Sequence, residues 1–318
     1  FHGFNSKQRK YIRHIFRQKN SEELTFDQIK KGYFRLMSEA YFEPIYPDIV
    51  ADENNGSYRL QIYGRPENNF NIGVGGAIAS RNISQIFLGL EHYYFDNYLL
   101  KNSMSFYSGS FYKSAQLRTR LNLPALGQFY IETDLTYNRW DFVSSDDILK
   151  LERSPTILDR TDRKYGLNIG FPLGSKLRAV LNGAWVDNFD SFADAGNISS
   201  SDTLNRLELD GFRFGFTFDR NNLNRKQYAN EGKSFRLSAD YFNLREKYLP
   251  GSSVQGDIIR QDRSRVRVRA DIEQFFRYGR YSTGYYVGVE LSTQTRFDND
   301  LATFISSPTK APNQDSKT

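Results

Sequence analysis

The sequence predicts a mainly β protein, a transmembrane antiparallel β-barrel preceded by a small α+β module. From Phe70 onward, stretches of about 9 to 15 residues alternate polar and apolar side chains, as strands with two different faces do. The connections between them alternate between short turns and long polar loops, as in outer-membrane barrels. Aromatic residues make up 15% of a chain whose mean hydropathy is only −0.63. Because only every second residue of a barrel strand faces lipid, a barrel can be this hydrophilic on average.

Residues 1–66 predict two helices followed by a hairpin. "SKQRKYIRHIF" places apolar residues at helical spacing, with Ser6 as the expected N-cap. "TFDQIKKGYFRLMSEA" repeats the pattern with Thr25 as the cap, and the side chains expected to point inward are Phe26, Ile29, Tyr33, Phe34 and Met37. "YFEPIYPDIV" and "SYRLQIYGR", joined by "ADENNG", predict two paired strands. No signal peptide opens the chain, so we expect further sequence, including a first strand of this module, before Phe1.

Residues 67–318 contain eleven of the alternating stretches and predict the barrel. The first of them, "NIGVGGAIAS", contains Gly73, Gly75 and Gly76. Glycine lowers pairing strength, so we expect a weak first strand. No helix follows these glycines, which excludes a phosphate-binding loop.

The stretch "GFRFGFTFDR" illustrates the two expected faces. Four side chains share the face expected to contact lipid: Phe212, Phe214, Phe216 and Phe218. Gly215 lies on the opposite face, where we expect a serine to be tolerated. Aromatic residues near strand ends, such as Tyr93, Tyr94 and Trp185, are expected at the membrane interfaces. A soluble β-sandwich also alternates, although eleven long strands with this loop asymmetry are unusual for one.

The stretch "SRVRVRADIEQFF" predicts a row of charges on one face of a strand, which we expect to line a polar lumen: Arg265, Arg267, Arg269, Asp271 and Glu273. The acids that could face this row are Glu132, Asp134, Asp240, Asp271 and Glu273. Mutual neutralisation would make the row a brace that stiffens the wall. The alternative is a docking surface for a returning loop or a passing acidic segment.

Catalysis and nucleic-acid binding find little support. The net charge of +6 comes from 43 basic residues set against 37 acidic ones along most of the chain, so a phosphate-binding patch is disfavoured. There are no cysteines and three histidines, and we predict no metal site, no cofactor and no catalytic residue. Ser108 and Ser110 lie inside a strand and lack the second glycine of a nucleophile elbow. We therefore expect this segment not to be an enzyme.

Several stretches resemble a known group. "FGFTFDRNNLNRKQYANEGKSFRLSADYF" is similar to the strand-turn-strand signature of the BamA/TamA superfamily of outer-membrane barrels. The resemblance assigns the turn to Asp219, Arg220, Asn221 and Asn222 and the start of the next strand to Gly232; the usual Pro before that Gly is replaced here. "YGLNIGFPLGSKLRAVLNGAW" resembles the preceding hairpin of the family. "FDQIKKGYFRLMSEAYFEPIYPDI" resembles part of a POTRA module, the periplasmic domain that precedes such barrels.

A single such module followed by "NIGVGGAIASRNISQIFLGLEHYYFDN" is most similar to patatin-like phospholipases with a carboxy-terminal barrel. The resemblance implies a POTRA-like module over residues 1–66 in the periplasm and, over 67–318, a barrel of the sixteen-stranded type in outer-membrane lipid, truncated at its carboxy end. The patatin motif Gly-x-Ser-x-Gly is not in these residues. The implied function is to anchor, translocate or assemble a polypeptide, such as an amino-terminal lipase of the same chain. A general assembly factor for other barrels is the alternative; a passive porin would have no use for the module.

Overall fold

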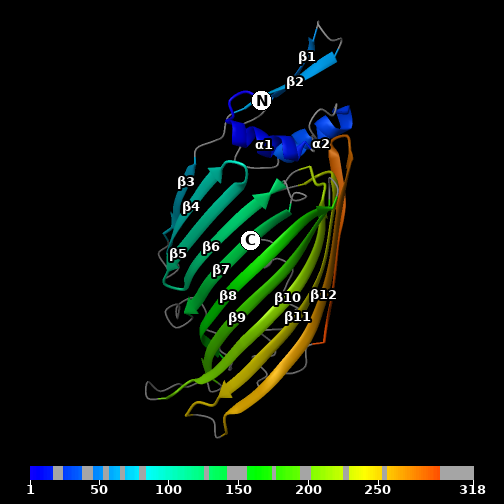
Figure 1. The fold of residues 1–318 in the computed structure, drawn as a ribbon. Helices are drawn as coiled ribbons and strands as arrows, with labels where there is room; N and C mark the ends of the chain where they lie inside the picture. Colours follow the sequence, from blue (N-terminus) through cyan, green and yellow to red (C-terminus); the bar gives the residue numbers. More distant parts are fainter. Residues whose placement is uncertain are drawn as a thin grey trace.

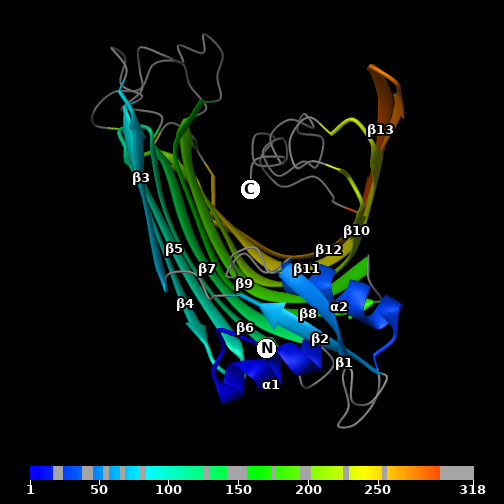
Figure 2. The ribbon, with the colours of Figure 1, turned by 90° about the horizontal axis from the view of Figure 1, so that it is seen from above.

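One curved antiparallel sheet dominates the computed structural model. The structure describes residues 1–16, 24–37, 46–52, 57–64, 69–78, 84–124, 129–141, 156–173, 177–193, 202–224, 229–252 and 256–293. Eleven strands lie side by side in chain order, which confirms the predicted strand number: β3 (Phe70–Ala77), β4 (Gln85–Phe95), β5 (Leu99–Gly109), β6 (Tyr112–Leu123), β7 (Phe129–Asp141), β8 (Thr156–Leu173), β9 (Leu177–Ala193), β10 (Asn205–Asn221), β11 (Gly232–Leu249), β12 (Ile259–Tyr278) and β13 (Tyr281–Ser292). Over the described residues the sheet forms a trough that is open between β3 and β13 (Figures 1 and 2).

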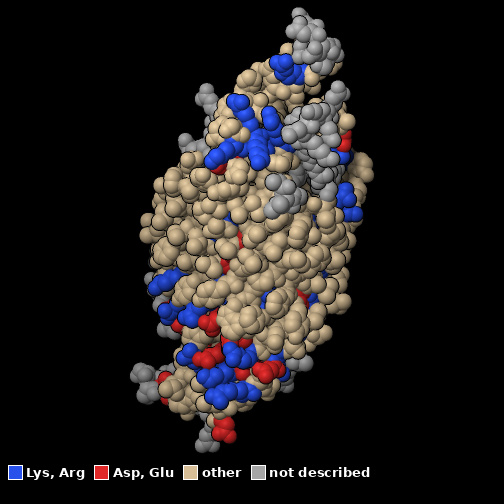
Figure 3. All heavy atoms as spheres, in the orientation of Figure 1, with Lys and Arg blue, Asp and Glu red and all other residues tan. Residues whose placement is uncertain are grey.

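The two faces of the sheet differ as the alternation predicts. The convex face carries a broad band almost free of charged side chains, and Lys, Arg, Asp and Glu gather at its two ends (Figure 3). Phe212, Phe214 and Phe216 are 49%, 56% and 39% exposed. Exposed large apolar side chains of this kind suit contact with lipid rather than water. No helix among the described residues is long and apolar enough to cross a bilayer.

The connection between β10 and β11 begins later than predicted. Asp219, Arg220 and Asn221 belong to β10, and only Asn222 lies beyond the strand. The strand continues because these residues still pair with β11, up to Asn221 across from Ser234. The Asp219 carboxylate also accepts a hydrogen bond from Arg178 of β9 at 2.9 Å. Gly232 opens β11, as the resemblance implied, with φ +112°. A Cβ there would lie 2.3 Å from the carbonyl oxygen of Asn222, so another residue would be strained.

The amino-terminal module consists of α1 (Ser6–Ile15), α2 (Phe26–Met37) and a hairpin of β1 (Tyr46–Asp52) with β2 (Ser57–Tyr63), which confirms the predicted elements. The N-cap of α1 is Asn5 rather than Ser6, because Asn5 and Gln8 form a reciprocal capping box. Thr25 caps α2 through Oγ1, which accepts a hydrogen bond from the Gln28 N–H at 3.3 Å.

The buried side chains of α2 differ in part from those predicted. Phe26 is 74% exposed, whereas Leu36 is fully buried. Phe26 is the first residue of the helix, ahead of the turn that packs on α1. Gly32 permits close packing, because a Cβ there would lie 2.3 Å from the ring of Phe16. The side chains of Phe34 and Met37 lie outside the described residues.

A shared hydrophobic core joins the module to the sheet. It combines side chains of the module with three from the end of the β4–β5 hairpin: Phe4, Tyr11, Ile12, Ile15, Phe16, Leu36, Ile62, Tyr93, Phe95 and Leu99. Tyr11 packs edge-on against Phe95 with ring centroids 5.1 Å apart. Tyr93 is 3% exposed, so its expected place at a membrane interface is wrong. Since one core spans both parts, α1 is fixed on this end of the sheet.

We expect Tyr11→Ala to release α1 from the sheet. The ring is 1% exposed, and removing a buried aromatic ring of this size costs about 3 kcal/mol. Hydrogen exchange should accelerate in α1 and stay unchanged in the middle of β10. Tyr58→Ala on β2 is the control, because Tyr58 is 77% exposed. Equal exchange in the two variants would show that the core does not hold the module.

Candidate functional site: the concave wall

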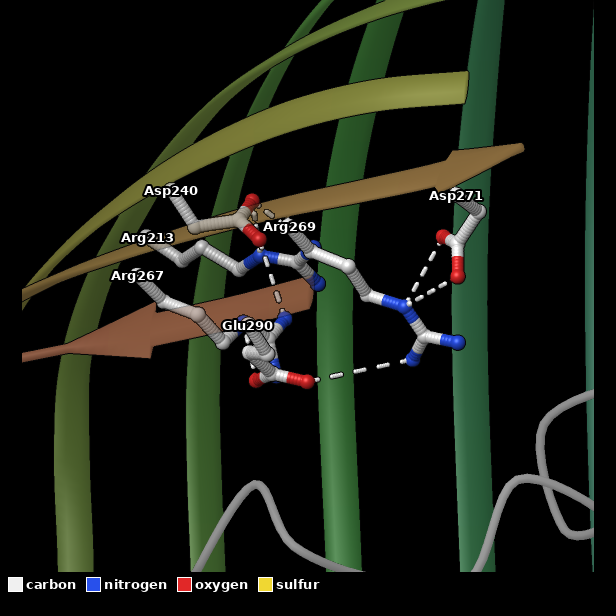
Figure 4. A network of polar contacts seen from close by, with 6 residues as sticks. All are labelled: Arg213, Asp240, Arg267, Arg269, Asp271 and Glu290. Atoms are coloured by element: carbon white, nitrogen blue, oxygen red, sulfur yellow. Dashed lines mark hydrogen bonds and ion pairs between the residues drawn. The ribbon is translucent and has the colours of Figure 1, made fainter. Parts of the chain in front are cut away.

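The charged row of β12 forms a network with its neighbours on the concave face of the sheet (Figure 4). Asp240 of β11 lies at its centre and is 5% exposed. One carboxylate oxygen, Oδ1, accepts hydrogen bonds from Arg213 of β10, from Nε at 3.1 Å and from Nη2 at 2.9 Å. The other, Oδ2, accepts one from Arg267 Nη2 at 2.9 Å. A single carboxylate therefore bridges three strands.

Strand register explains why these groups meet. Asp240 lies directly across from Gly215 on one side and from Arg267 on the other. Gly215 leaves the space into which the carboxylate extends, because a Cβ there would lie 2.5 Å from Asp240 Oδ1. A serine at Gly215, which we expected to be tolerated, would therefore require the Asp240 carboxylate to shift.

Two further members of the row, Arg269 and Asp271, pair along β12, and the arginines also approach an acid of β13. Arg269 donates from Nε to Asp271 at 2.9 Å. Glu290 of β13 lies 3.8 Å from Arg267 and 4.0 Å from Arg269, measured between charged atoms. Sequence reasoning missed Glu290, although its place in the alternating stretch "YYVGVELS" puts it on the same face. Glu273 stands across from Ser234 and Tyr286.

An aromatic ring lies among the arginines. Phe242 is 8% exposed, and three guanidinium carbons lie over its ring, those of Arg213, Arg265 and Arg267, at 5.7, 4.5 and 5.5 Å from the centroid. Guanidinium groups are attracted to the face of an aromatic ring and can pack against it. The sequence gives a weak indication of this contact. Phe242 follows Asp240 by two residues, so the two side chains point to the same face of the strand.

Glu132 and Asp134 do not take part in the network, contrary to the expectation. Both lie on β7, three strands away from β10. Asp134 accepts a hydrogen bond from Lys164 at 2.6 Å and lies 3.9 Å from Arg118. Glu132 accepts one from the Asn168 amide at 3.2 Å. The wall thus carries a second, separate cluster of opposite charges.

The first strand lies at the other edge of the sheet. The ring of Phe87 lies beside Gly73 and Gly75. A Cβ at Gly73 would lie 3.6 Å from this ring and a Cβ at Gly75 3.8 Å from it, so both positions could accept a side chain. A hollow of about 440 Å³ beside them is lined by residues of β3 to β6, among them Gly73, Gly89 and Ser103. The described residues include no group of three His, Cys, Asp or Glu side chains that could hold a metal ion.

Comparisons with known proteins bear on the fold alone. Neither protein-family models nor curated proteins match the sequence. Among solved structures, the chain is similar to BamA from Haemophilus ducreyi lacking POTRA domains 1–3, with a TM-score of 0.56 and 13% identity over 89% of this chain and 52% of that one. The sheet is thus similar in fold to part of that BamA structure. CdiB from Acinetobacter baumannii is also similar, with a TM-score of 0.43 and 9% identity over 93% of this chain and 62% of that one. The chain thus spans about half the length of the BamA chain.

We expect Asp240→Asn to destabilise the sheet by about 1–3 kcal/mol, because it leaves Arg213 and Arg267 beside each other without their shared anion. This expected loss of stability is smaller than the usual cost of breaking a buried ion pair, because both arginines are partly exposed. Arg267→Gln should cost less, because Asp240 keeps Arg213. The measurement is the temperature at which the folded band is lost on a heat-modifiability gel. Asp210→Asn, which breaks a more exposed pair with Arg245, is the control; an equal shift in both variants would contradict a central role for Asp240.

Proposed function

We propose that this chain belongs to an outer-membrane barrel that inserts or translocates polypeptides. The observation that carries the proposal is a BamA-like sheet whose first strand is short and rich in glycine. β3 pairs with β4 over eight residue pairs, whereas β10 pairs with β11 over sixteen. In a sixteen-stranded barrel that closed on this strand, the seam would be the weakest joint, where a client strand could be admitted.

The amino-terminal residues 1–66 fit the proposal as a POTRA-like module, with residues 67–318 as the barrel region. His2 makes an isolated parallel bridge to Tyr63 beside the two-stranded antiparallel hairpin, and two helices accompany it. The module lies at the end of the sheet opposite the long polar connections. Long loops of outer-membrane barrels face the outside, so the module would lie in the periplasm.

Two kinds of polypeptide client are compatible with this proposal. The likeness of "NIGVGGAIASRNISQIFLGLEHYYFDN" to the patatin-like group favours a lipase domain fused at the amino end. The BamA-like fold supports the alternative, an insertion factor for other barrels. For the Arg265, Arg267 and Arg269 row we favour the wall brace, because Arg267 and Arg269 lie at contact distance from Asp240, Asp271 and Glu290. Arg265 packs over the Phe242 ring instead.

Strengthening the first strand tests the function. The full-length protein in vesicles should accelerate folding of an added unfolded barrel client, measured as the heat-modifiable band, compared with empty vesicles. Gly73→Val with Gly75→Val should slow this insertion while the protein itself stays folded, because valine favours strand pairing and both sites have room. Gly183→Val in β9 is the control, with similar space around its Cβ. No acceleration by the unaltered protein would overturn the function, and equal rates for all variants would overturn the role of the first strand.

Lipid contact is tested separately. If the convex band faces hydrocarbon, Phe214→Arg should destabilise the folded protein by about 2–4 kcal/mol. Thr217→Arg in the same strand places the charge on the concave face and should cost less than about 1 kcal/mol. Urea unfolding in vesicles measures both. Similar losses would argue for a soluble fold.

A further inference from the structure

We propose that the exposed basic face of α1 binds the anionic headgroups of phospholipids in the leaflet at its end of the barrel. The inference rests on the membrane placement proposed above. It goes beyond that placement because it gives the amino-terminal module a direct contact with the lipid surface.

The two faces of α1 differ sharply in charge. Tyr11, Ile12 and Ile15 are 1%, 0% and 5% exposed and belong to the core shared with the sheet. The opposite side carries exposed cations, which are Lys7, Arg9, Lys10 and Arg13. The helix sequence "SKQRKYIRHI" contains no acidic residue. The positive charge is therefore not neutralised within the helix.

Contacts with the β4–β5 turn fix the direction of this face. Lys7 Nζ forms a salt bridge with Asp96 Oδ2 at 2.9 Å, and the Gln8 side-chain amide donates to the Phe95 carbonyl oxygen at 3.2 Å. These bonds and the core prevent the helix from rolling on the sheet. The Asp96 carboxylate also raises the pKa of Lys7 above its usual value.

The basic face lies at the border of the uncharged band. Figure 3 shows a group of Lys and Arg side chains over α1, directly beyond the band on the convex side. Tyr94, which is 45% exposed, and Tyr98 pack together beside Asp96 with ring centroids 5.6 Å apart. Tyrosines at the rim of an apolar band mark the depth of the headgroups. Cations at this depth face phosphate groups rather than bulk water.

The physical effect of such cations is sufficient to select lipids. Each Lys or Arg near an anionic bilayer surface strengthens attachment by a factor of about five, and the effect falls off within about 10 Å at moderate salt. Lys10 and Arg13 together would thus strengthen attachment to an anionic surface on the order of twenty-five-fold. An acidic protein partner could use the same charges, but the bilayer is already adjacent to them.

Fluorescence quenching in vesicles tests the proposal. The chain has no cysteine, so a single Ser6→Cys substitution can carry a fluorophore at the start of α1, and Phe214→Cys can carry one in the apolar band. The full-length labelled protein is placed in phosphatidylcholine vesicles that contain phosphatidylglycerol. The nitroxide quencher is attached near the headgroup end of the acyl chain of one lipid or the other. The lipid preference is the ratio of the apparent association constants obtained from the two quenchers.

The Ser6 label should prefer phosphatidylglycerol, and salt of about 0.5 M should abolish the preference because exposed charges are screened. Arg13→Gln should lower the preference for phosphatidylglycerol about fivefold. The double substitution Lys10→Gln with Arg13→Gln should lower this preference further. Arg59→Gln is the matched control, on β2, which lies farther from the sheet than α1 (Figure 1), and should change nothing.

The outcomes separate this proposal from the one on which it rests. Quenching of the Phe214 label by both lipids, without a lipid preference at Ser6, would overturn the docking of α1 and leave the membrane placement standing. A preference that survives the double substitution would also overturn it. Absence of quenching at Phe214 would overturn the membrane placement itself, and the docking with it. Heat-modifiability of each variant shows that the barrel is folded.

Discussion

Backbone hydrogen bonding between neighbouring strands is the constraint on which the structure depends. A bilayer offers no partner for a free N–H or C=O group, so a chain that crosses it in strands must pair each strand along its length. The ladders of this sheet run without interruption over sixteen residue pairs between β9 and β10 and over seventeen between β11 and β12. Once the hydrogen-bond ladders fix the register, each side chain points either to the convex or to the concave face of the sheet. The apolar band and the charged wall both follow from that division.

The charged wall shows how opposite charges stabilise the concave face without forming a core. Its carboxylates are the least exposed members: Asp240 is 5% exposed, Asp134 6% and Glu246 2%. Each binds a longer basic side chain from a neighbouring strand, as Glu246 binds Arg263 at 2.9 Å. Because short acids lie deep and long cations reach over them, a row of arginines becomes compatible with a folded wall. The cross-strand pairs also oppose slippage, since a shift by one residue would place these charges on the apolar convex face.

Period-two alternation carries enough information to predict the strands and their faces, and it did so for Phe212, Phe214 and the row of β12. It cannot predict which residues face each other across strands, because that depends on register. Asp240 was placed correctly, whereas Asp134 lies too many strands away and Glu290 was missed. Tyr93 was assigned to an interface because aromatic residues near strand ends look alike in sequence; only the packing of α1 shows that this ring is buried. The turn after β10 was misplaced because the sequence Asp-Arg-Asn-Asn is compatible both with a turn and with the end of a strand. In the structure it ends the strand, where Asp219 pairs with Arg178.

The packing of α1 on the β4–β5 hairpin has a further consequence for the seam. β4 is the strand that β3 pairs with, and its last residues, Tyr93 and Phe95, are held by the core shared with the module. β3 itself contributes no residue to that core among the described residues. The module therefore stabilises the second strand of the sheet while leaving the first to its eight backbone pairs. In the function proposed above, this arrangement would let β3 separate from β4, or pair with a client strand, without loosening the hairpin beside it.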